Sequence, residues 1–207
     1  MAAATMLFGA AGKASAARGK PHPPRRSDAH ISLHVSNHSV LRGDGVLVRG
    51  AIRPQGVHRV RVLIRGAARL SMSLRTDARG AFTAHLGAMG TGSYAVRAYG
   101  LHDRRTTGSA SPARRLTVYR RAEASYYGPG LYGGVLACGG TLQPGTLGVA
   151  HKTLPCGTPV KLRYRGRSIT VPVVDRGPYV AGRDFDLTEA TKARLGFPST
   201  GVLLASR

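Results

Sequence analysis

Three side chains that could hold or exchange protons lie within a short stretch of the second half of the chain. They are His151, Asp175 and Asp186, set among glycine, proline and β-branched residues. A carboxyl group can act as a general acid and then, once it has lost its proton, as a general base. An imidazole beside it can donate or accept a hydrogen bond. We therefore expect one site at which the three side chains meet, with the His151 ring contacting Asp175.

Short strands and tight turns must position these residues. The β-rich runs 160–164 and 168–174 flank a turn at 165–167, which predicts a hairpin. Asp175 follows the second strand directly, at the point where the chain turns away. Residues 187–195 form the one convincing helix, and Asp186 stands at its start.

Each of the three residues also has a purely structural interpretation. Asp175 could anchor its own turn, and Asp186 could belong to the cap of the helix. His151 precedes Lys152-Thr153-Leu154-Pro155, so its ring could simply satisfy backbone groups of a tight turn. These alternatives stay open on the sequence alone.

The start of the chain resembles an export signal. An apolar run over residues 1–12 precedes Ala14-Ser15-Ala16, a pattern of small residues typical of a cleavage site. The positive charges that usually open such a signal are missing, so we expect 1–16 to be a signal peptide truncated at its beginning; the alternative is an apolar tail. Residues 17–28 are typical of a basic, proline-rich linker. No run is long enough to cross a bilayer, so no transmembrane segment is expected.

The chain has two cysteines, Cys138 and Cys156. An even number of cysteines in an exported protein favours a disulfide bond. A metal site would need more ligands at closer spacing. We therefore predict a Cys138–Cys156 disulfide, and we expect neither a metal ion nor a cofactor.

A strong positive charge covers the first half of the chain. The formal net charge is +22, and residues 1–121 hold 21 of the 31 lysines and arginines. Nucleic acid is the first partner that such a charge suggests. The chain has no basic helix, no recognisable nucleic-acid module and few aromatic residues for base stacking. We therefore expect an anionic polymer of the cell envelope as the partner of the basic half, and no nucleic acid.

Alternating apolar and polar residues run through residues 29–121. About seven short runs of this kind, with turn signals every 8–12 residues, predict an immunoglobulin-like β-sandwich. The pieces LVRGAIRPQG, TDARGAFTAHL and GSYAVRAYG resemble bacterial extracellular immunoglobulin-like repeats. The histidines of this half show no ligand spacing and are expected on its surface: His30, His34, His38, His58, His85 and His102.

The second half, residues 122–207, resembles the rare lipoprotein A family. The resemblance is carried by ASYYGPG, LACGGTLQPGTLGVAHKTLPCGTPV, GRSITVPVVDRGPYVAGRDFDLT and ATKARLGF, in that order. Members of this family are double-psi β-barrels of the bacterial envelope, more distantly related to expansins and barwin. The resemblance implies a six-stranded barrel with one short helix. The whole chain is then an all-β protein of two domains.

The resemblance also implies an activity on the cell wall. Enzymes of this family are lytic transglycosylases, which cleave peptidoglycan glycan strands without water and leave a 1,6-anhydro-N-acetylmuramic acid end. On this basis Asp175, His151 and Asp186 are the expected catalytic residues. The expected substrate-binding residues are Tyr126, Tyr127, Thr141, Arg176 and Tyr179.

One position departs from the pattern of the active enzymes. They carry a glutamate eleven residues before the histidine, and this chain has Gly140 there. The Cys-Gly-Gly segment is more similar to the expansins and barwin. The alternative to an enzyme is therefore a non-catalytic, expansin-like protein that binds peptidoglycan or another polysaccharide. Either function places the protein outside the cell, associated with the wall.

Overall fold

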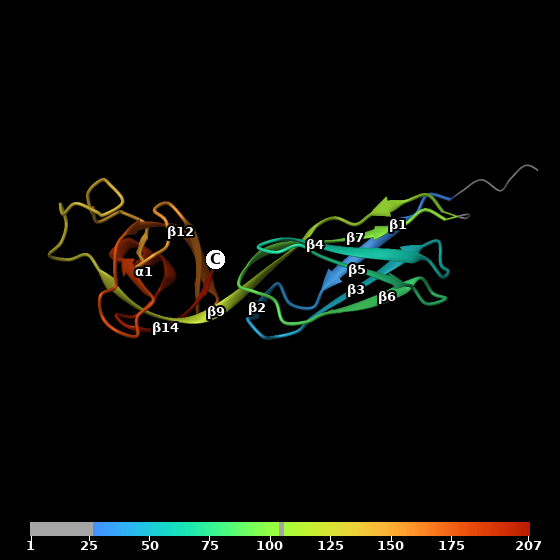
Figure 1. Ribbon diagram of the computed structural model, residues 1–207, viewed down its shortest axis with the longest axis horizontal. Helices are drawn as coiled ribbons and strands as arrows, with labels where there is room; N and C mark the ends of the chain where they lie inside the picture. Colours follow the sequence, from blue (N-terminus) through green and yellow to red (C-terminus); the bar gives the residue numbers. More distant parts are fainter. Residues whose placement is uncertain (1–26, 104–105) are drawn as a thin grey trace, which may run out of the picture.

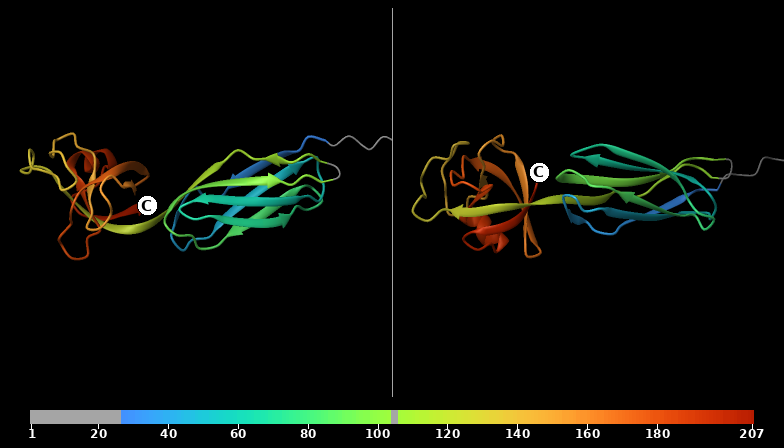
Figure 2. Two further views of the ribbon diagram at one scale, coloured as in Figure 1. Left: turned by 45° about the horizontal axis from the view of Figure 1, so that its top comes forward. Right: turned by 60° about the horizontal axis from the view of Figure 1, so that its bottom comes forward.

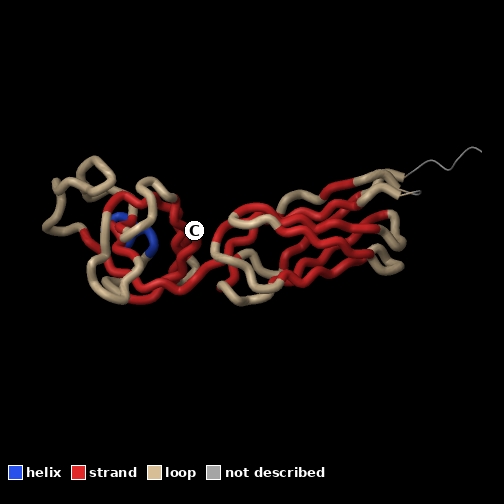
Figure 3. The backbone as a smooth tube through the Cα atoms, viewed as in Figure 1, coloured by secondary structure: helices blue, strands red, loops and turns tan. Residues whose placement is uncertain are grey.

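The computed structural model describes residues 27–103 and 106–207, which form two lobes arranged end to end (Figure 1). The predicted signal peptide, residues 1–16, and nearly all of the predicted linker, residues 17–28, lie outside the described residues. Strands dominate both lobes (Figure 3). In the described part of the chain, no helix is long and apolar enough to cross a membrane.

Two sheets make up the lobe nearer the N-terminus. One contains β1 (His30–Val35), β3 (Val46–Arg53) and β6 (Ala81–Leu86). The other contains β2 (Ser39–Leu41), β4 (Arg59–Gly66), β5 (Leu70–Arg75), β7 (Gly92–Gly100), β8 (Ser109–Ala110) and the first part of β9 (Arg114–Tyr127). Alternate residues of each strand point into the space between the sheets, as Ile31, Leu33 and Val35 do on β1. The predicted β-sandwich is confirmed as a two-sheet structure, and its immunoglobulin-like character stays a prediction.

Six strands close into a barrel in the second lobe. In order around the barrel they are β13 (Phe185–Thr188), β10 (Val149–Ala150), β12 (Arg167–Asp175), β11 (Pro159–Tyr164), β14 (Gly201–Ser206) and β9. Pairing of β13 with β9 closes the ring. The predicted hairpin is β11–β12, and the six-stranded barrel is confirmed.

One helix, α1 (Glu189–Leu195), packs against the barrel. Its N-cap is Thr188, whose hydroxyl accepts a hydrogen bond from the backbone N–H of Thr191. Gly196 ends the helix with a φ of 65°, in the left-handed region that favours glycine. The predicted helix is therefore confirmed, and it begins two residues later than the sequence pattern indicated.

The strand β9 belongs to both lobes. Its residues 114–118 pair with β7, residues 120–124 pair with β14, and residues 124–127 pair with β13. Figure 2 shows it running as one strand from the sandwich into the barrel. The two hydrophobic cores are separate along this strand, since Val118 belongs to the first and Ala122 to the second. The predicted division near residue 121 falls between these cores and stays a prediction.

Polar contacts fix the junction of the two lobes beside β9. The Lys161 ammonium donates to the Thr117 hydroxyl over 3.2 Å, and the Arg163 guanidinium donates to the Ser39 hydroxyl over 2.6 Å. Tyr119, which is fully buried, lies among the side chains of Ser39, Thr117 and Arg163. The C-terminus also lies between the lobes (Figure 1). The sandwich and the barrel are therefore held by side-chain contacts as well as by the shared strand.

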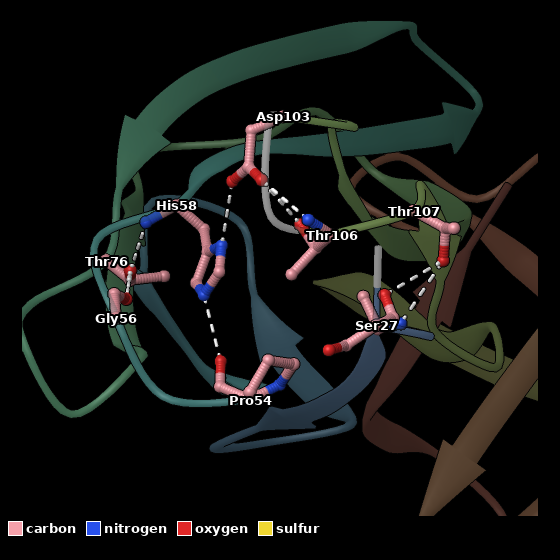
Figure 4. Close-up of polar contacts among 9 residues, drawn as sticks. Ser27, Pro54, Gly56, His58, Thr76, Asp103, Thr106 and Thr107 are labelled. Carbon is pink, nitrogen blue, oxygen red and sulfur yellow. Dashed lines mark hydrogen bonds and ion pairs between the residues drawn. The ribbon is translucent and has the colours of Figure 1, made fainter. Parts of the chain in front are cut away.

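One histidine of the sandwich is buried, contrary to the expectation that all six lie on its surface. His58 is only 5% exposed, and its ring contacts the Asp103 carboxylate at 3.1 Å and the Pro54 carbonyl at 2.9 Å (Figure 4). Its backbone N–H donates to the Thr76 hydroxyl. The ring therefore ties together loops at the end of the sandwich, a structural role that the scattered histidine positions did not indicate.

Candidate active site

The register of four barrel strands places two carboxylates in one row. Ala150 on β10 pairs with Asp175 on β12 on one side and with Asp186 on β13 on the other. Asp186 in turn pairs with Ser125 on β9. Residues paired across a sheet share a face, so Asp175, Ala150, Asp186 and Ser125 form a row, which we call the carboxylate row. The two acids stand two strand spacings apart, roughly 10 Å between their Cα atoms.

Asp175 is held by the backbone around it. Its Oδ1 accepts hydrogen bonds from the backbone N–H of Ala137 at 2.9 Å and of Arg176 at 2.8 Å. The first of these bonds fastens the loop before β10 to the end of β12. Both bonds engage the same carboxylate oxygen, so the carboxylate has a fixed orientation.

A short chain of polar groups supports Asp186. The Ser125 hydroxyl donates to Asp186 Oδ1, and Ser125 Oγ accepts a hydrogen bond from Arg183 Nη1 at 3.0 Å. Ser125 is buried, at 4% exposure. The hydroxyl and the guanidinium together fix the orientation of the Asp186 carboxylate.

Tyr127 lies close to both acids. It lies on the same face of β9 as Ser125, two residues further along the strand. Burial and the neighbouring carboxylates of Asp175 and Asp186 raise the pKa of the Tyr127 hydroxyl well above its usual value. The hydroxyl therefore keeps its proton at neutral pH. Its oxygen is buried, so its polar neighbours are the two carboxylates and not solvent.

The His151 ring does not meet Asp175, so that prediction is wrong. Its Nδ1 accepts hydrogen bonds from the backbone N–H of Thr153 at 3.2 Å and of Leu154 at 3.0 Å. The ring packs against Phe185 with centroids 5.1 Å apart. Phe185 and Asp186 are neighbours on a strand and point to opposite faces, as do Ala150 and His151 at the end of β10.

Instead, the His151 ring faces the junction with the sandwich. It lines a cavity of about 180 Å³ together with Thr91 of the sandwich, Arg120, Phe185 and Arg207 of the barrel end. Burial lowers the pKa of the imidazole, and the positive charge of Arg120 lowers it further. The structure therefore agrees with the structural alternative for His151, in which the ring satisfies backbone groups of a tight turn.

Arg176 is occupied by the protein itself. Its Nη1 donates to the carbonyl oxygens of His151 at 3.2 Å and Leu154 at 2.9 Å, and its Nη2 lies 3.2 Å from Cys156 Sγ. These contacts spread the guanidinium over the turn 151–156. Arg176 was predicted to bind substrate, and the structure places it where it fixes this turn.

The other predicted substrate-binding residues separate into two groups. Tyr126 points to the face of β9 opposite Tyr127, packs on the barrel core and has the Lys192 ammonium 3.9 Å from its ring centre. Tyr179 is 85% exposed beside the end of the carboxylate row, and Thr141 is exposed in the loop before β10. Tyr179 and Thr141 are thus exposed, whereas the Tyr127 hydroxyl is buried and Tyr126 faces the barrel core.

The predicted disulfide is present. Cys138 and Cys156 are bonded, with their Cα atoms 5.5 Å apart. The Cys138 N–H also donates to the Val174 carbonyl next to Asp175. The bond therefore ties the loop that contacts Asp175 to the turn that Arg176 holds. Among the described residues, no group of three or more side chains is arranged to hold a metal ion.

The second lobe is similar in sequence to known proteins. Residues 120–204 match the family described as "Lytic transglycolase". A probable endolytic peptidoglycan transglycosylase RlpA from Synechocystis is 42% identical over 81 residues, which are 38% of this chain and 25% of the relative. This part of the chain belongs to the RlpA-like double-psi β-barrel family.

Two further relatives agree with that assignment. A probable RlpA transglycosylase from Aquifex aeolicus is 42% identical over 92 residues, 44% of this chain and 41% of its own length. The endolytic peptidoglycan transglycosylase RlpA of Pseudomonas aeruginosa is 39% identical over 94 residues, 44% of this chain and 28% of its own length. The chain thus spans less than half the length of these relatives.

The RlpA-like barrel also presents features that the sequence analysis did not select. Ser125 and Arg183 support Asp186. Residues 125 and 127 lie on the same face of a strand, so the selection of Tyr127 could also have pointed to Ser125. Exposed apolar and aromatic side chains occupy two loops near Asp175: Leu131, Tyr132, Val135, Tyr179 and Val180. The longer of these loops lies at the end of the molecule away from the sandwich (Figure 1).

Proposed function

We propose that this protein cleaves peptidoglycan glycan strands as a lytic transglycosylase at the cell wall, outside the cell. The observation that carries the proposal is the carboxylate row on an RlpA-like barrel, with Tyr127 close to both acids. The names of the relatives support the same substrate. Exposed Tyr132 and Tyr179 near the row suit the apolar faces of sugar rings.

Asp175 is the proposed acid and base. In its protonated form it gives a proton to the oxygen of the glycosidic bond as that bond to the N-acetylmuramic acid breaks. As a carboxylate it then takes the proton of the C6 hydroxyl while O6 bonds to C1, which closes the 1,6-anhydro ring without water. The backbone donors hold Oδ1, so the proton passes through Oδ2.

Asp186 and Tyr127 have supporting roles in this proposal. Asp186, oriented by Ser125 and Arg183, stabilises the positive charge that develops on the sugar ring. Tyr127 stays protonated, and its buried hydroxyl supports the Asp175 carboxylate from behind. His151 and Arg176 act through the turn 151–156, where they position the end of β12, rather than by touching substrate.

Incubation with purified sacculi tests the proposal. We expect the protein to release 1,6-anhydro muropeptides, detected by mass spectrometry. The substitution Asp175→Asn should lower release by about a hundredfold or more, because an amide cannot transfer a proton to the leaving oxygen or take one from the C6 hydroxyl. Asp77→Asn, at a turn of the sandwich, is the matched control and should leave release unchanged. Unchanged release by Asp175→Asn would remove Asp175 from the acid–base role.

A second function is favoured by Gly140. The RlpA enzymes that the sequence resembles have a glutamate at this position, and no acidic residue lies between Glu123 and Asp175 here. The same face could then bind glycan strands in the manner of expansins without cutting them. Retention of the protein on sacculi with no anhydro products would select this function and reject the enzyme.

We further propose that the basic sandwich binds an anionic polymer of the cell wall. This proposal rests on the charge of the first half, where 21 lysines and arginines face 4 acidic residues.

A further inference from the structure

The outer face of the larger sandwich sheet is lined with arginines. They are exposed side chains of neighbouring strands: Arg59, Arg61 and Arg65 on β4, Arg75 on β5, Arg97 on β7 and Arg115 on β9. We call these six residues, together with Lys161 of the barrel, the arginine track.

Pairing between the strands brings like charges together on this face. Arg59 stands directly opposite Arg75 across β4 and β5. Like charges at directly paired positions destabilise a sheet unless an anion lies between them. Among the described residues, no ion pair joins an arginine of the track to a carboxylate. The face therefore carries positive charge that the protein does not neutralise.

Three hollows follow one another along the track. The first, of about 400 Å³, is lined by Arg59, Arg61 and Arg75, and the second, of about 360 Å³, by Arg61 and Arg65. The third, of about 410 Å³, contains Arg65 and Arg115 and ends at Lys161 and Thr170 of the barrel. Each hollow shares an arginine with the next, and none has an acidic residue in its lining.

The junction makes the third hollow a fixed part of this surface. Lys161 is anchored by its hydrogen bond to Thr117, on the strand shared by sandwich and barrel. The hollows therefore continue from the sandwich onto the barrel without a flexible connection. An extended chain could follow them from Arg75 to Lys161.

The side chains of the arginine track indicate which kind of polymer it could bind. Arginine forks suit phosphate oxygens, and side chains on one face of a strand recur about every 7 Å, which a flexible chain of phosphodiesters can follow. Hydroxyls of Ser71, Ser73 and Ser93 lie between the arginines and suit polyol groups. Single-stranded nucleic acid is bound on exposed aromatic platforms, and Tyr99, half-buried, is the one aromatic on this face that is not fully buried.

We propose that the arginine track binds one linear polyol-phosphate polymer of the cell wall, laid along the sandwich and reaching the barrel. The inference deepens the proposed binding of wall polymers, and it does not depend on whether the barrel cuts glycan strands. The track would hold the barrel beside the polymer-bearing wall.

Binding of the full chain to a synthetic poly(glycerol phosphate) tests this inference. The triple variant Arg61→Gln, Arg65→Gln, Arg97→Gln removes three charges from the track. The matched control, Arg49→Gln, Arg53→Gln, Arg79→Gln, removes three exposed charges from the other sheet and its turn. We expect the track variant to bind at least about tenfold more weakly. The slope of log K against the logarithm of the salt concentration should be smaller in magnitude by roughly 2. The control should stay within about twofold of the wild type.

Three outcomes would overturn the inference. They are equal losses in the two triple variants, no binding by the wild type, and tighter binding of a single-stranded oligonucleotide than of the polymer. Thermal unfolding of each variant shows whether the fold is retained, which is expected because every substituted side chain is exposed. Release of anhydro muropeptides from polymer-free sacculi is measured on the same proteins. If the wild type binds the polymer through the track but releases no anhydro muropeptides, that result counts against the enzyme and leaves the binding by the arginine track intact.

Discussion

Gly140 stands where the active enzymes that the sequence resembles are expected to carry a glutamate. Its φ is 77°, a conformation that residues with side chains rarely adopt, and open space lies where a side chain would begin. A glutamate would therefore fit sterically at a backbone cost of about 1 kcal/mol. The loop around it is tied to Asp175 through Ala137, so the new carboxylate would lie near the proposed acid.

The substitution Gly140→Glu should raise the release of anhydro muropeptides, since it supplies a second acid beside Asp175. The expected gain is at least about tenfold, which is less than the roughly hundredfold or more that a fully positioned acid or base contributes. Gly140→Ala is the control, because it has the same backbone cost and no carboxylate. If both variants behave alike, the missing glutamate does not limit activity.

His151 should make stability depend on pH. Burial and Arg120 lower the pKa of its ring in the folded protein, so the unfolded chain binds the proton more readily. The contribution of the neutral ring is therefore present above the unfolded pKa of about 6.5, and it is lost as pH falls through the lower folded value. We expect the free energy of unfolding to fall between pH 7.5 and pH 5.

His151→Asn isolates this effect, because the amide oxygen can accept the hydrogen bonds that Nδ1 receives from Thr153 and Leu154. Urea unfolding at several pH values should show a weaker pH dependence in the variant than in the wild type. Identical pH profiles would mean that other histidines carry the dependence.

For single residues, the sequence indicated which side chains lie near one another better than it indicated which way each side chain points. Asp175 and Asp186 lie in one row, as expected of a shared site. The His151 ring turns the other way because His151 directly follows Ala150, the last residue of β10, and a single step along extended backbone reverses the face. The bulge in the β10–β12 pairing, which sets that register, leaves no signal in the sequence.

Among the elements, the disulfide has the clearest measurable effect. It closes a loop between residues 138 and 156, which contains β10 and the turn held by Arg176. Replacing Cys138 and Cys156 by serine should lower the free energy of unfolding by about 3 kcal/mol, the usual value for a loop of this length. Release of muropeptides should fall as well, since the loop that contacts Asp175 loses its anchor.

Urea unfolding of the double variant measures the change, and reduction of the wild-type disulfide should reproduce it. A thiol assay that finds two free thiols in the oxidised wild-type protein would contradict the bond.

Regular elements were the most predictable part of the fold. Strict alternation predicted β1, β4 and β7, and a turn between two β-rich runs predicted the β11–β12 hairpin. The long segment between β9 and β10 could not be predicted in the same way, because its shape depends on the disulfide and on single hydrogen bonds to Asp175 and Val174. Those contacts join residues far apart in the chain.

For the whole molecule, the shared strand predicts a rigid junction. Backbone amides from 114 to 127 take part in continuous pairing, first with sandwich strands and then with barrel strands. We expect hydrogen exchange to be slow throughout β9, with no fast segment around residues 119–121. Rapid exchange there would show a flexible linker instead.

Arg163→Ala should speed exchange at the junction, because it removes the hydrogen bond to Ser39 and a polar neighbour of buried Tyr119. Arg194→Ala, an exposed change on α1, is the control and should leave exchange in β9 unchanged. The sequence placed a domain division near residue 121, and it carried no sign that one strand crosses it.

That crossing strand leaves no convenient place to divide the protein. A fragment ending at residue 119 would keep the partners of β2 and β7 but lose every contact that Lys161 and Arg163 make. A fragment starting at residue 120 would expose, as a frayed end, the strand on which Ser125 and Tyr127 sit. A protease at the cell wall should also cleave slowly at this point, since the scissile bond would lie within paired backbone.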